Sequence, residues 1–295
     1  MRLVKASYDI YAASFNKNLP YSYDDSKLLI EVAGRTCYKS EEKIAEGTAE
    51  KFVAMLRSRT HCAMIEHSWS LRKYWFSWTP YYKFLNFMII STGETLVSGN
   101  DRAFEEWEFK RKNEYNAPTK NDIDEIYKEK QWNMLSATVK VVTDRGVTHE
   151  QVRHRPPAYA QESTRYCNYC NSKFNNHITF LIPCWLDLPE GEFSWENAPD
   201  SICAANNLGA WYWFKSMCDS EQIYNSLISE GWIPGRARSV LPNSLKTEIV
   251  ITADLAEWQH IFKLRTAPDA HEQMREVMIP LQEDFKKQMP EVFGS

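Results

Sequence analysis

The sequence predicts a fold that combines strands and helices, and two observations carry that prediction. Residues 139–142 and 247–252 are apolar or β-branched runs, as in buried strands, and each is followed by a helical pattern. The chain also ends in a long amphipathic helix, where Pro280 could introduce a kink. Its apolar residues recur at helical spacing: Met274, Val277, Met278, Leu281, Phe285 and Met289.

Earlier parts of the chain add a further helix and strand. Phe52, Met55 and Leu56 fall at helical spacing behind Thr48, and residues 68–76 partly alternate as in a strand. Residues 105–131 are rich in Lys, Glu, Asn and Asp, which is typical of an exposed insertion or a solvated helix. No repeat, low-complexity stretch or long linker divides the chain, so we expect one domain over residues 1–295.

Two helix boundaries bear on function. Thr148 and Gln151 form a Thr-x-x-Gln capping box, which predicts a short helix starting at Thr148. The prolines at 156 and 157 should stop that helix near Arg155. In the C-terminal third, Asp254 is placed to cap a helix that ends around Arg265.

Composition excludes several function classes. The 295 residues carry a formal charge of −4, which argues against nucleic acid or an anionic membrane as the main partner. No apolar run has the length of a signal peptide core or a membrane span. The seven cysteines are an odd number scattered along the chain, which indicates reduced thiols. We therefore expect a cytoplasmic protein.

The densest chemistry lies between residues 145 and 165, which hold four arginines and two histidines close to three tyrosines. A guanidinium binds phosphate in bidentate fashion, and aromatic rings can stack on a planar ligand. The pattern therefore predicts a local anion site. A salt-bridged, solvated helix end is the alternative, because Asp144, Glu150 and Glu162 are close in sequence.

One spacing in this region resembles a known motif. Arg153, His154 and Arg155 are followed, after seven residues, by Ser163 and Arg165, as in the flavin-dependent thymidylate synthases. The resemblance extends to Glu-His-Ser at 66–68, to SGNDRA at 98–103, to ARSVLP at 237–242 and to Leu-Arg at 264–265.

This resemblance implies an α+β fold in which a mixed or antiparallel sheet is flanked by helices, consistent with the lack of a Gly-x-Gly-x-x-Gly fingerprint. It also implies a homotetramer with active sites at subunit interfaces. The implied reaction converts dUMP to dTMP. Methylenetetrahydrofolate donates the carbon, reduced FAD donates the hydride, and NADPH reduces the flavin.

The resemblance assigns roles to individual residues. Arg265 is the expected catalytic residue, because a guanidinium near the pyrimidine carbonyls can stabilise developing negative charge. The residues expected to hold dUMP are Gln161, Ser163, Thr164, Arg165, Arg238 and Arg265. Those expected near FAD are His67, Arg153, His154, Arg155 and His260.

No metal site is expected, because Cys167 and Cys170 form a lone CxxC without a second pair at ligand spacing. Cys184 follows a proline, as does the nucleophile of the unrelated cysteine-dependent thymidylate synthases. Nothing else matches those enzymes, so we expect Cys184 to be a buried structural thiol.

The chain departs from the family pattern around the motif. Many members have an acid where Gln161 stands, and here Ala158 and Ala160 replace the usual Ser and Asn. Glu150 stands where Gln is expected. These changes leave open a same-fold enzyme that adds another one-carbon group, such as hydroxymethyl, to a pyrimidine nucleotide. A nucleic-acid-binding module is a further alternative, although the net charge argues against it.

Overall fold

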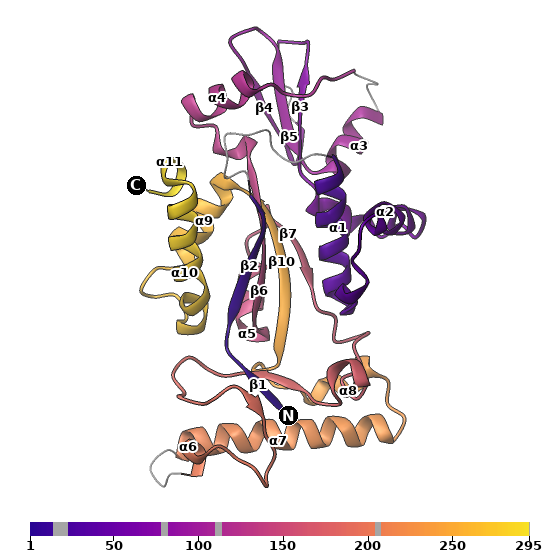
Figure 1. Ribbon diagram of the computed structural model, residues 1–295, viewed down its shortest axis with the longest axis vertical. Coiled ribbons are helices and arrows are strands. Elements are labelled where there is room, and N and C mark those ends of the chain that lie inside the picture. Colours follow the sequence, from indigo (N-terminus) through magenta and orange to yellow (C-terminus); the bar gives the residue numbers. More distant parts are fainter. Residues whose placement is uncertain (14–22, 78–81, 110–113, 204–207, 295) are drawn as a thin grey trace.

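The computed structural model describes residues 1–13, 23–77, 82–109, 114–203 and 208–294. Its centre is a four-stranded antiparallel sheet, which stands upright in Figure 1 with helices on both sides. The strands, in spatial order, are β2 (Ser7–Ala13), β6 (Ser136–Asp144), β10 (Lys246–Asp254) and β7 (Ala158–Gln161).

Two smaller sheets lie beyond the two ends of the central sheet (Figure 1). One is antiparallel and consists of β3 (Ser70–Tyr74), β5 (Thr95–Gly99) and β4 (Leu85–Ile89). The other is mixed and consists of β8 (Thr179–Leu181), β1 (Arg2–Val4) and β9 (Gly191–Glu192). The protein therefore has the α+β fold that the sequence predicts.

The helices divide between the two faces of the central sheet (Figure 1). On one side lie α1 (Tyr23–Tyr38) and α2 (Thr48–Ser58). On the other lie α9 (Leu255–Arg265), α10 (Glu272–Gln288) and α11 (Pro290–Phe293). The remaining helices are α3 (Asp101–Phe109), α4 (Lys120–Lys128), α5 (Arg145–Gln151), α6 (Asp200–Cys203), α7 (Leu208–Ser229) and α8 (Pro234–Ala237).

The alternation of a strand explains this two-sided arrangement. Ile249 and Ile251 of β10 belong to the core that includes α9 and α10, whereas Val250 packs with Val32 and Ala33 of α1. Successive side chains of a strand point to opposite faces, so a continuous apolar run requires cover on both. Full burial of each such side chain contributes about 1.5–3 kcal/mol. The run at 247–252 is thus confirmed as a doubly covered strand.

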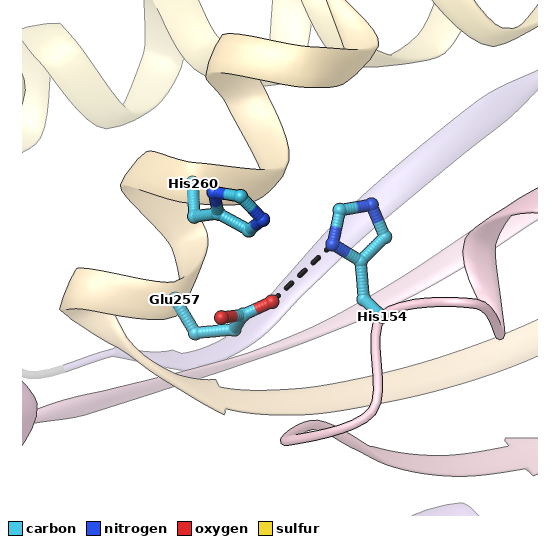
Figure 2. A group of neighbouring side chains, drawn as sticks. All are labelled: His154, Glu257 and His260. Atoms are coloured by element: carbon cyan, nitrogen blue, oxygen red, sulfur yellow. Dashed lines mark hydrogen bonds and ion pairs between the residues drawn. The ribbon is translucent and has the colours of Figure 1, made fainter.

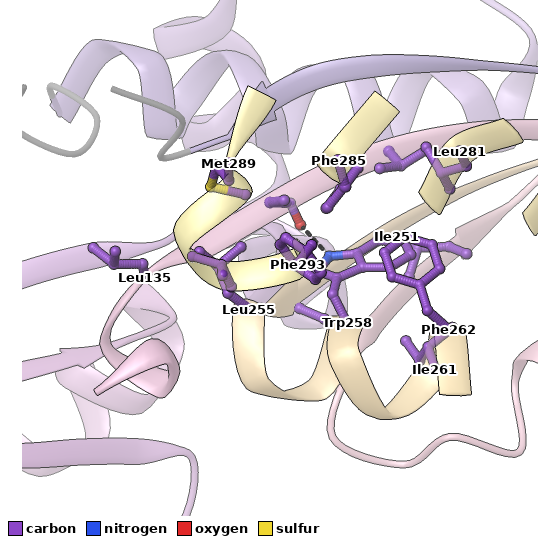
Figure 3. Close-up of a cluster of buried hydrophobic side chains, with 14 of the residues drawn as sticks. Leu135, Ile251, Leu255, Trp258, Ile261, Phe262, Leu281, Phe285, Met289 and Phe293 are labelled. Atoms are coloured by element: carbon purple, nitrogen blue, oxygen red, sulfur yellow. Dashed lines mark hydrogen bonds between the residues drawn. The ribbon is translucent and has the colours of Figure 1, made fainter. Parts of the chain in front are cut away.

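An aromatic cluster joins α9 to the C-terminal helices (Figure 3). The Trp258 ring lies 5.5 Å from the Phe262 ring, and the Phe285 ring is 5.2 Å from Phe262. The Trp258 indole N–H donates to the carbonyl of Ala137 at 3.1 Å, so its polar atom is satisfied inside the core. These contacts hold α9, which carries several functional candidates, rigidly against the sheet.

One local prediction is wrong, and a second is only partly correct. The helix near residue 148 begins at Arg145, because the Asp144 carboxylate accepts from the Val147 N–H at 2.7 Å. Thr148 is therefore an interior residue, and its hydroxyl donates to the Arg145 carbonyl. The stretch 105–131 is not simply exposed, because Trp107, Ile123 and Ile126 are buried on the inner faces of α3 and α4.

Among the described residues, no helix has both the length and the apolar character that crossing a membrane requires.

Candidate functional site

The turn after α5 presents the Arg-His-Arg motif. The helix ends at Gln151, and Arg153 and Arg155 are exposed while His154 between them is buried. No described residue pairs with either exposed guanidinium. The prolines at 156 and 157 remove two backbone donors and lead the chain directly into β7, so the turn holds the three side chains of the motif in a short constrained segment.

His154 connects this turn to α9. Its Nδ1 lies 3.3 Å from Oε1 of Glu257, and its Nε2 accepts from Nε of Arg265 at 3.0 Å. Figure 2 shows His154 and Glu257 facing each other, and His260 lies beside Glu257 on α9. The His154 and His260 rings are 5.6 Å apart. The structure therefore brings together three residues that the sequence placed at the flavin or the pyrimidine.

Arg265 is also held by α5. Its Nη2 donates to the carbonyl of Glu150 at 2.8 Å, and its Nη1 lies 3.3 Å from the Glu150 carboxylate. Glu150, which departs from the family pattern, thus gives Arg265 a carboxylate partner. We call Arg265, His154, Glu257 and Glu150 the Arg265 cluster.

Sequence reasoning missed Glu257. It stands three residues before His260 on α9, so the two share one helix face, and this spacing was available in the sequence. Its proximity to His154, which is 103 residues away, was not. Ligand atoms of His154, Glu257 and His260 all lie within 4.8 Å of one another, so these residues could also hold a metal ion.

A second group of predicted residues consists of the loop after β7 and of Arg238, which reaches that loop from a 3-10 helix at Arg238–Val240. The Arg238 guanidinium donates to the hydroxyl of buried Thr164 at 3.1 Å. The Ser163 hydroxyl accepts from the Arg165 N–H at 3.3 Å, and the Arg165 side chain lies over the Tyr166 ring. No described carboxylate pairs with either arginine. We call Ser163, Thr164, Arg165 and Arg238 the Arg165 loop; no hydrogen bond or ion pair between described residues joins it to the Arg265 cluster.

Gln161 and His67 are held by structural partners. The Gln161 amide donates to the hydroxyls of Thr148 at 2.8 Å and Thr247 at 3.2 Å. His67 is fully buried, with Nδ1 3.0 Å from the hydroxyl of Thr252, and burial lowers its pKa to about 4. The His67 imidazole is therefore uncharged at pH 7. Its expected contact with a cofactor stays a prediction.

A cavity of about 520 Å³ is lined by Arg155, the residue after His154, but by no member of the Arg265 cluster. Three aromatic side chains, Trp69, Tyr82 and Phe84, line it together with Arg155 and Asp254. Burial raises the pKa of Asp254 to about 6, and this carboxylate caps α9 by accepting from the Glu257 N–H. Aromatic walls beside a free guanidinium suit a planar ring that carries acceptor groups, as a flavin does. Of the Arg-His-Arg motif, only Arg155 lines this cavity.

Three cysteines that the sequence singled out, Cys167, Cys170 and Cys184, are not activated nucleophiles. Burial raises the pKa of Cys167 to about 11, and the Cys170 thiol donates to the side-chain oxygen of Asn225. Cys184 is exposed, so the prediction of a buried thiol is wrong. Partial burial and nearby glutamates nevertheless raise the pKa of its thiol, which disfavours the reactive thiolate.

Residues 90–291 match the family described as "Thymidylate synthase complementing protein". The chain belongs to this family. The matched residues include the Arg265 cluster and the Arg165 loop, whereas His67 precedes them. The family resemblance carried by the Arg-His-Arg spacing is thus confirmed.

Relatives and a solved structure add detail. The chain is 32% identical over 140 residues to the flavin-dependent thymidylate synthase of Pyrococcus furiosus, which covers 48% of this chain and 50% of that protein. It is 28% identical over 165 residues to that of Corynebacterium efficiens, covering 51% and 57%. The chain thus spans about half the length of the curated relatives it matches. It also resembles the UMP/dUMP methylase PolB from Streptomyces cacaoi bound with 5-Br dUMP, with TM-score 0.47, 16% identity and coverage of 100% and 96%.

Proposed function

We propose that this protein is a flavin-dependent thymidylate synthase that methylates dUMP at C5 to form dTMP. The observation that carries the proposal is that a chain of this family presents two arginine groups of different character together with an aromatic cavity. One arginine group has no carboxylate partner among the residues that the structure describes, and the other is oriented by His154 and Glu150.

The Arg165 loop is suited to the nucleotide phosphate. A monophosphate carries nearly two negative charges at neutral pH and needs several charge-assisted donors. Arg165 and Arg238 are both exposed, and no described carboxylate neutralises them. The hydroxyls of Ser163 and Thr164 add short polar groups that can orient the ligand beside these charges.

The Arg265 cluster is suited to the pyrimidine. C5 of uracil becomes nucleophilic only when electron density moves toward it and negative charge develops at the carbonyls. A guanidinium already held in place stabilises that charge without reorganising at the moment of reaction. Arg265 is half-buried and bonded at three of its nitrogens, which meets this requirement.

The aromatic cavity is suited to the ring system of FAD, with Arg155 at its rim. We place Arg153, His154 and His260 along the same side, as the family resemblance implies. When bound, FAD supplies the hydride, NADPH restores its reduced form, and methylenetetrahydrofolate supplies the carbon. Gln161 is a weaker candidate for a dUMP contact, because its amide already donates to Thr148 and Thr247.

We further propose a homotetramer with shared active sites, supported by the apolar surface of α7. Leu208, Trp211 and Tyr212 are exposed near its start, and Trp232 and Ile233 are exposed after its end. Such surface is typical of subunit interfaces. The apolar face of α10 adds nothing to this surface, because Met274, Met278 and their neighbours are buried within the chain.

The decisive experiment combines flavin analysis with product identification. The purified protein should show a visible flavin spectrum and release FAD on denaturation. With dUMP, methylenetetrahydrofolate and NADPH it should form dTMP, identified by mass spectrometry. A hydroxymethyl product would replace the proposed function by the same-fold alternative. Absence of flavin together with salt-sensitive oligonucleotide binding would replace it by a nucleic-acid-binding module.

A further inference from the structure

The hydrogen bonds around His154 determine which ring nitrogen carries its proton. A guanidinium only donates, so the Arg265 Nε–H that approaches at 3.0 Å requires a lone pair on His154 Nε2. A neutral imidazole has one donor and one acceptor nitrogen, so its proton must be on Nδ1. That nitrogen lies 3.3 Å from the Glu257 carboxylate, which only accepts when ionised. The hydrogen bonds therefore all run in one direction: Arg265 donates to His154, and His154 donates to Glu257.

The same assignment argues against a metal ion in the group formed by His154, Glu257 and His260. A metal held beside Glu257 would need the lone pair of His154 Nδ1. The proton would then move to Nε2 and face the Nε–H of Arg265, donor against donor. Metal binding thus requires Arg265 to leave its position, whereas the hydrogen-bonded chain satisfies every group.

We propose that Glu257 is a positioning residue that fixes the tautomer of His154 and, through it, the orientation of the Arg265 guanidinium. The role of that guanidinium in dUMP chemistry rests on the proposed function. A carboxylate that orients a histidine through Nδ1–H is a common way to fix a tautomer in active sites.

These contacts determine which N–H groups of Arg265 remain available to a ligand. Of the five N–H groups of a guanidinium, one donates to His154 and two to Glu150, which leaves two. Glu150 holds the far end of the guanidinium and His154 holds Nε, so loss of either contact frees the group to turn. Glu257 does not contact Arg265 directly, and its effect passes through His154.

The first test reads the tautomer directly and needs no substrate. Nitrogen-15 NMR of labelled histidine in the purified full-length protein, with flavin content recorded, distinguishes the protonated ring nitrogen. A His154→Asn variant assigns the signal. We expect His154 to be protonated at Nδ1, and we expect Glu257→Ala to shift this signal. Protonation at Nε2, or a signal unchanged by Glu257→Ala, overturns the proposal.

The second test separates positioning from structure by turnover. Glu257→Ala should lower kcat about tenfold, the size of one net hydrogen bond, with little change in KM for dUMP. Glu257→Gln keeps an oxygen that accepts from Nδ1–H and should restore most of kcat. Glu283→Ala, which removes an exposed carboxylate on α10, is the matched control and should leave kcat unchanged. Circular dichroism and thermal melting verify that each variant folds.

Two results would overturn the inference. If Glu257→Gln is as inactive as Glu257→Ala, and the wild type binds added zinc while Glu257→Gln does not, the group is a metal site. If Glu257→Ala changes KM and not kcat, the residue does not orient Arg265. Failure of the proposed function would look different from failure of this inference. The wild type would then form no dTMP, while NMR would still show His154 protonated at Nδ1.

Discussion

The two arginine groups differ in how their charge is compensated before any ligand arrives. In the Arg265 cluster, Glu150 and His154 bond the guanidinium, and Glu257 supports the histidine. In the Arg165 loop, Arg238 bonds only a neutral hydroxyl, and Arg165 lies over a tyrosine ring. The Arg265 guanidinium is therefore oriented before a ligand binds, while the charges of the Arg165 loop stay available to an anion.

This difference suits the two ends of a nucleotide. A preorganised guanidinium stabilises charge that develops during reaction, because it need not reorient. An uncompensated guanidinium instead attracts a group that is already charged, and this attraction weakens with salt. We therefore expect substitutions in the Arg265 cluster to reduce turnover, and substitutions in the Arg165 loop to reduce affinity.

A third set of cations differs from both arginine groups, because its charges pair with a carboxylate of the central sheet. Glu248 is buried on β10 with the ammonium groups of Lys39, Lys140 and Lys246 around it. Burial alone would raise the pKa of Glu248, but the three lysines lower it well below its usual range. Each of these lysines already forms an ion pair with Glu248, so we expect them to contribute nothing to ligand binding.

The largest expected effect is accordingly on stability. Glu248→Gln leaves three half-buried lysines without this carboxylate and should lower the free energy of unfolding at pH 7 by about 3 kcal/mol. Because folding lowers the pKa of Glu248, its stabilisation is present above the ordinary carboxyl pKa of about 4.3 and is lost as the pH falls below it. Urea denaturation at a series of pH values measures this, and a difference between wild type and variant that does not shrink in acid would contradict it.

Arg265→Ala should have the next largest effect. Removing a preorganised donor at the site of developing charge typically costs about 100- to 1,000-fold in kcat. The dissociation constant for dUMP should change less, since the phosphate contacts remain. Steady-state kinetics with calorimetric titration separates the two quantities. A loss confined to affinity would place Arg265 with the Arg165 loop and remove the distinction between the groups.

Substitution in the Arg165 loop should act on affinity. Arg165→Ala or Arg238→Ala should raise the dUMP dissociation constant roughly 10- to 100-fold, because each loses a charge-assisted hydrogen bond worth about 1.5–3 kcal/mol. FAD content should change little. Calorimetric titration at two salt concentrations tests this, and unchanged affinity in both variants would exclude the loop from the nucleotide site.

How far the sequence could predict these groups depends on the range of each contact. The Arg-His-Arg spacing and the strand at 247–252 are local patterns, and both led to the correct family and fold. The start of α5 was misplaced because Asp144 and Thr148 both offer capping patterns, and only the structure shows which carboxylate or hydroxyl accepts. Glu257 escaped notice because its partner lies 103 residues away, and no sequence period reports such a contact.

The smallest expected effect concerns Cys184. Its thiol is exposed and its pKa is raised, so it is a poor nucleophile, and a hydride-dependent methylation needs no thiolate. Cys184→Ala should therefore form dTMP within about twofold of the wild-type rate, a change of less than 0.5 kcal/mol in the barrier. Mass spectrometry of the protein provides the check, and a covalent adduct between Cys184 and the nucleotide would refute the expected chemistry.

The proposed homotetramer requires the two arginine groups to complete one active site from different subunits. Arg165 and Arg238 belong to one group within a chain, since Arg238 bonds Thr164 of the Arg165 loop, whereas no hydrogen bond or ion pair among the described residues joins them to Arg265. The most direct measurement mixes inactive variants by refolding them together, with mass measurement of the mixed oligomers as the control. Arg165→Ala with Arg265→Ala should regain activity in up to about one quarter of the sites, as random assortment in a symmetric oligomer predicts. Arg165→Ala with Arg238→Ala should regain none, because Arg238 bonds Thr164 within one chain and both residues therefore serve a site from the same subunit. If mixed oligomers form and the first pair stays inactive, or if both pairs recover equally, the shared site is contradicted.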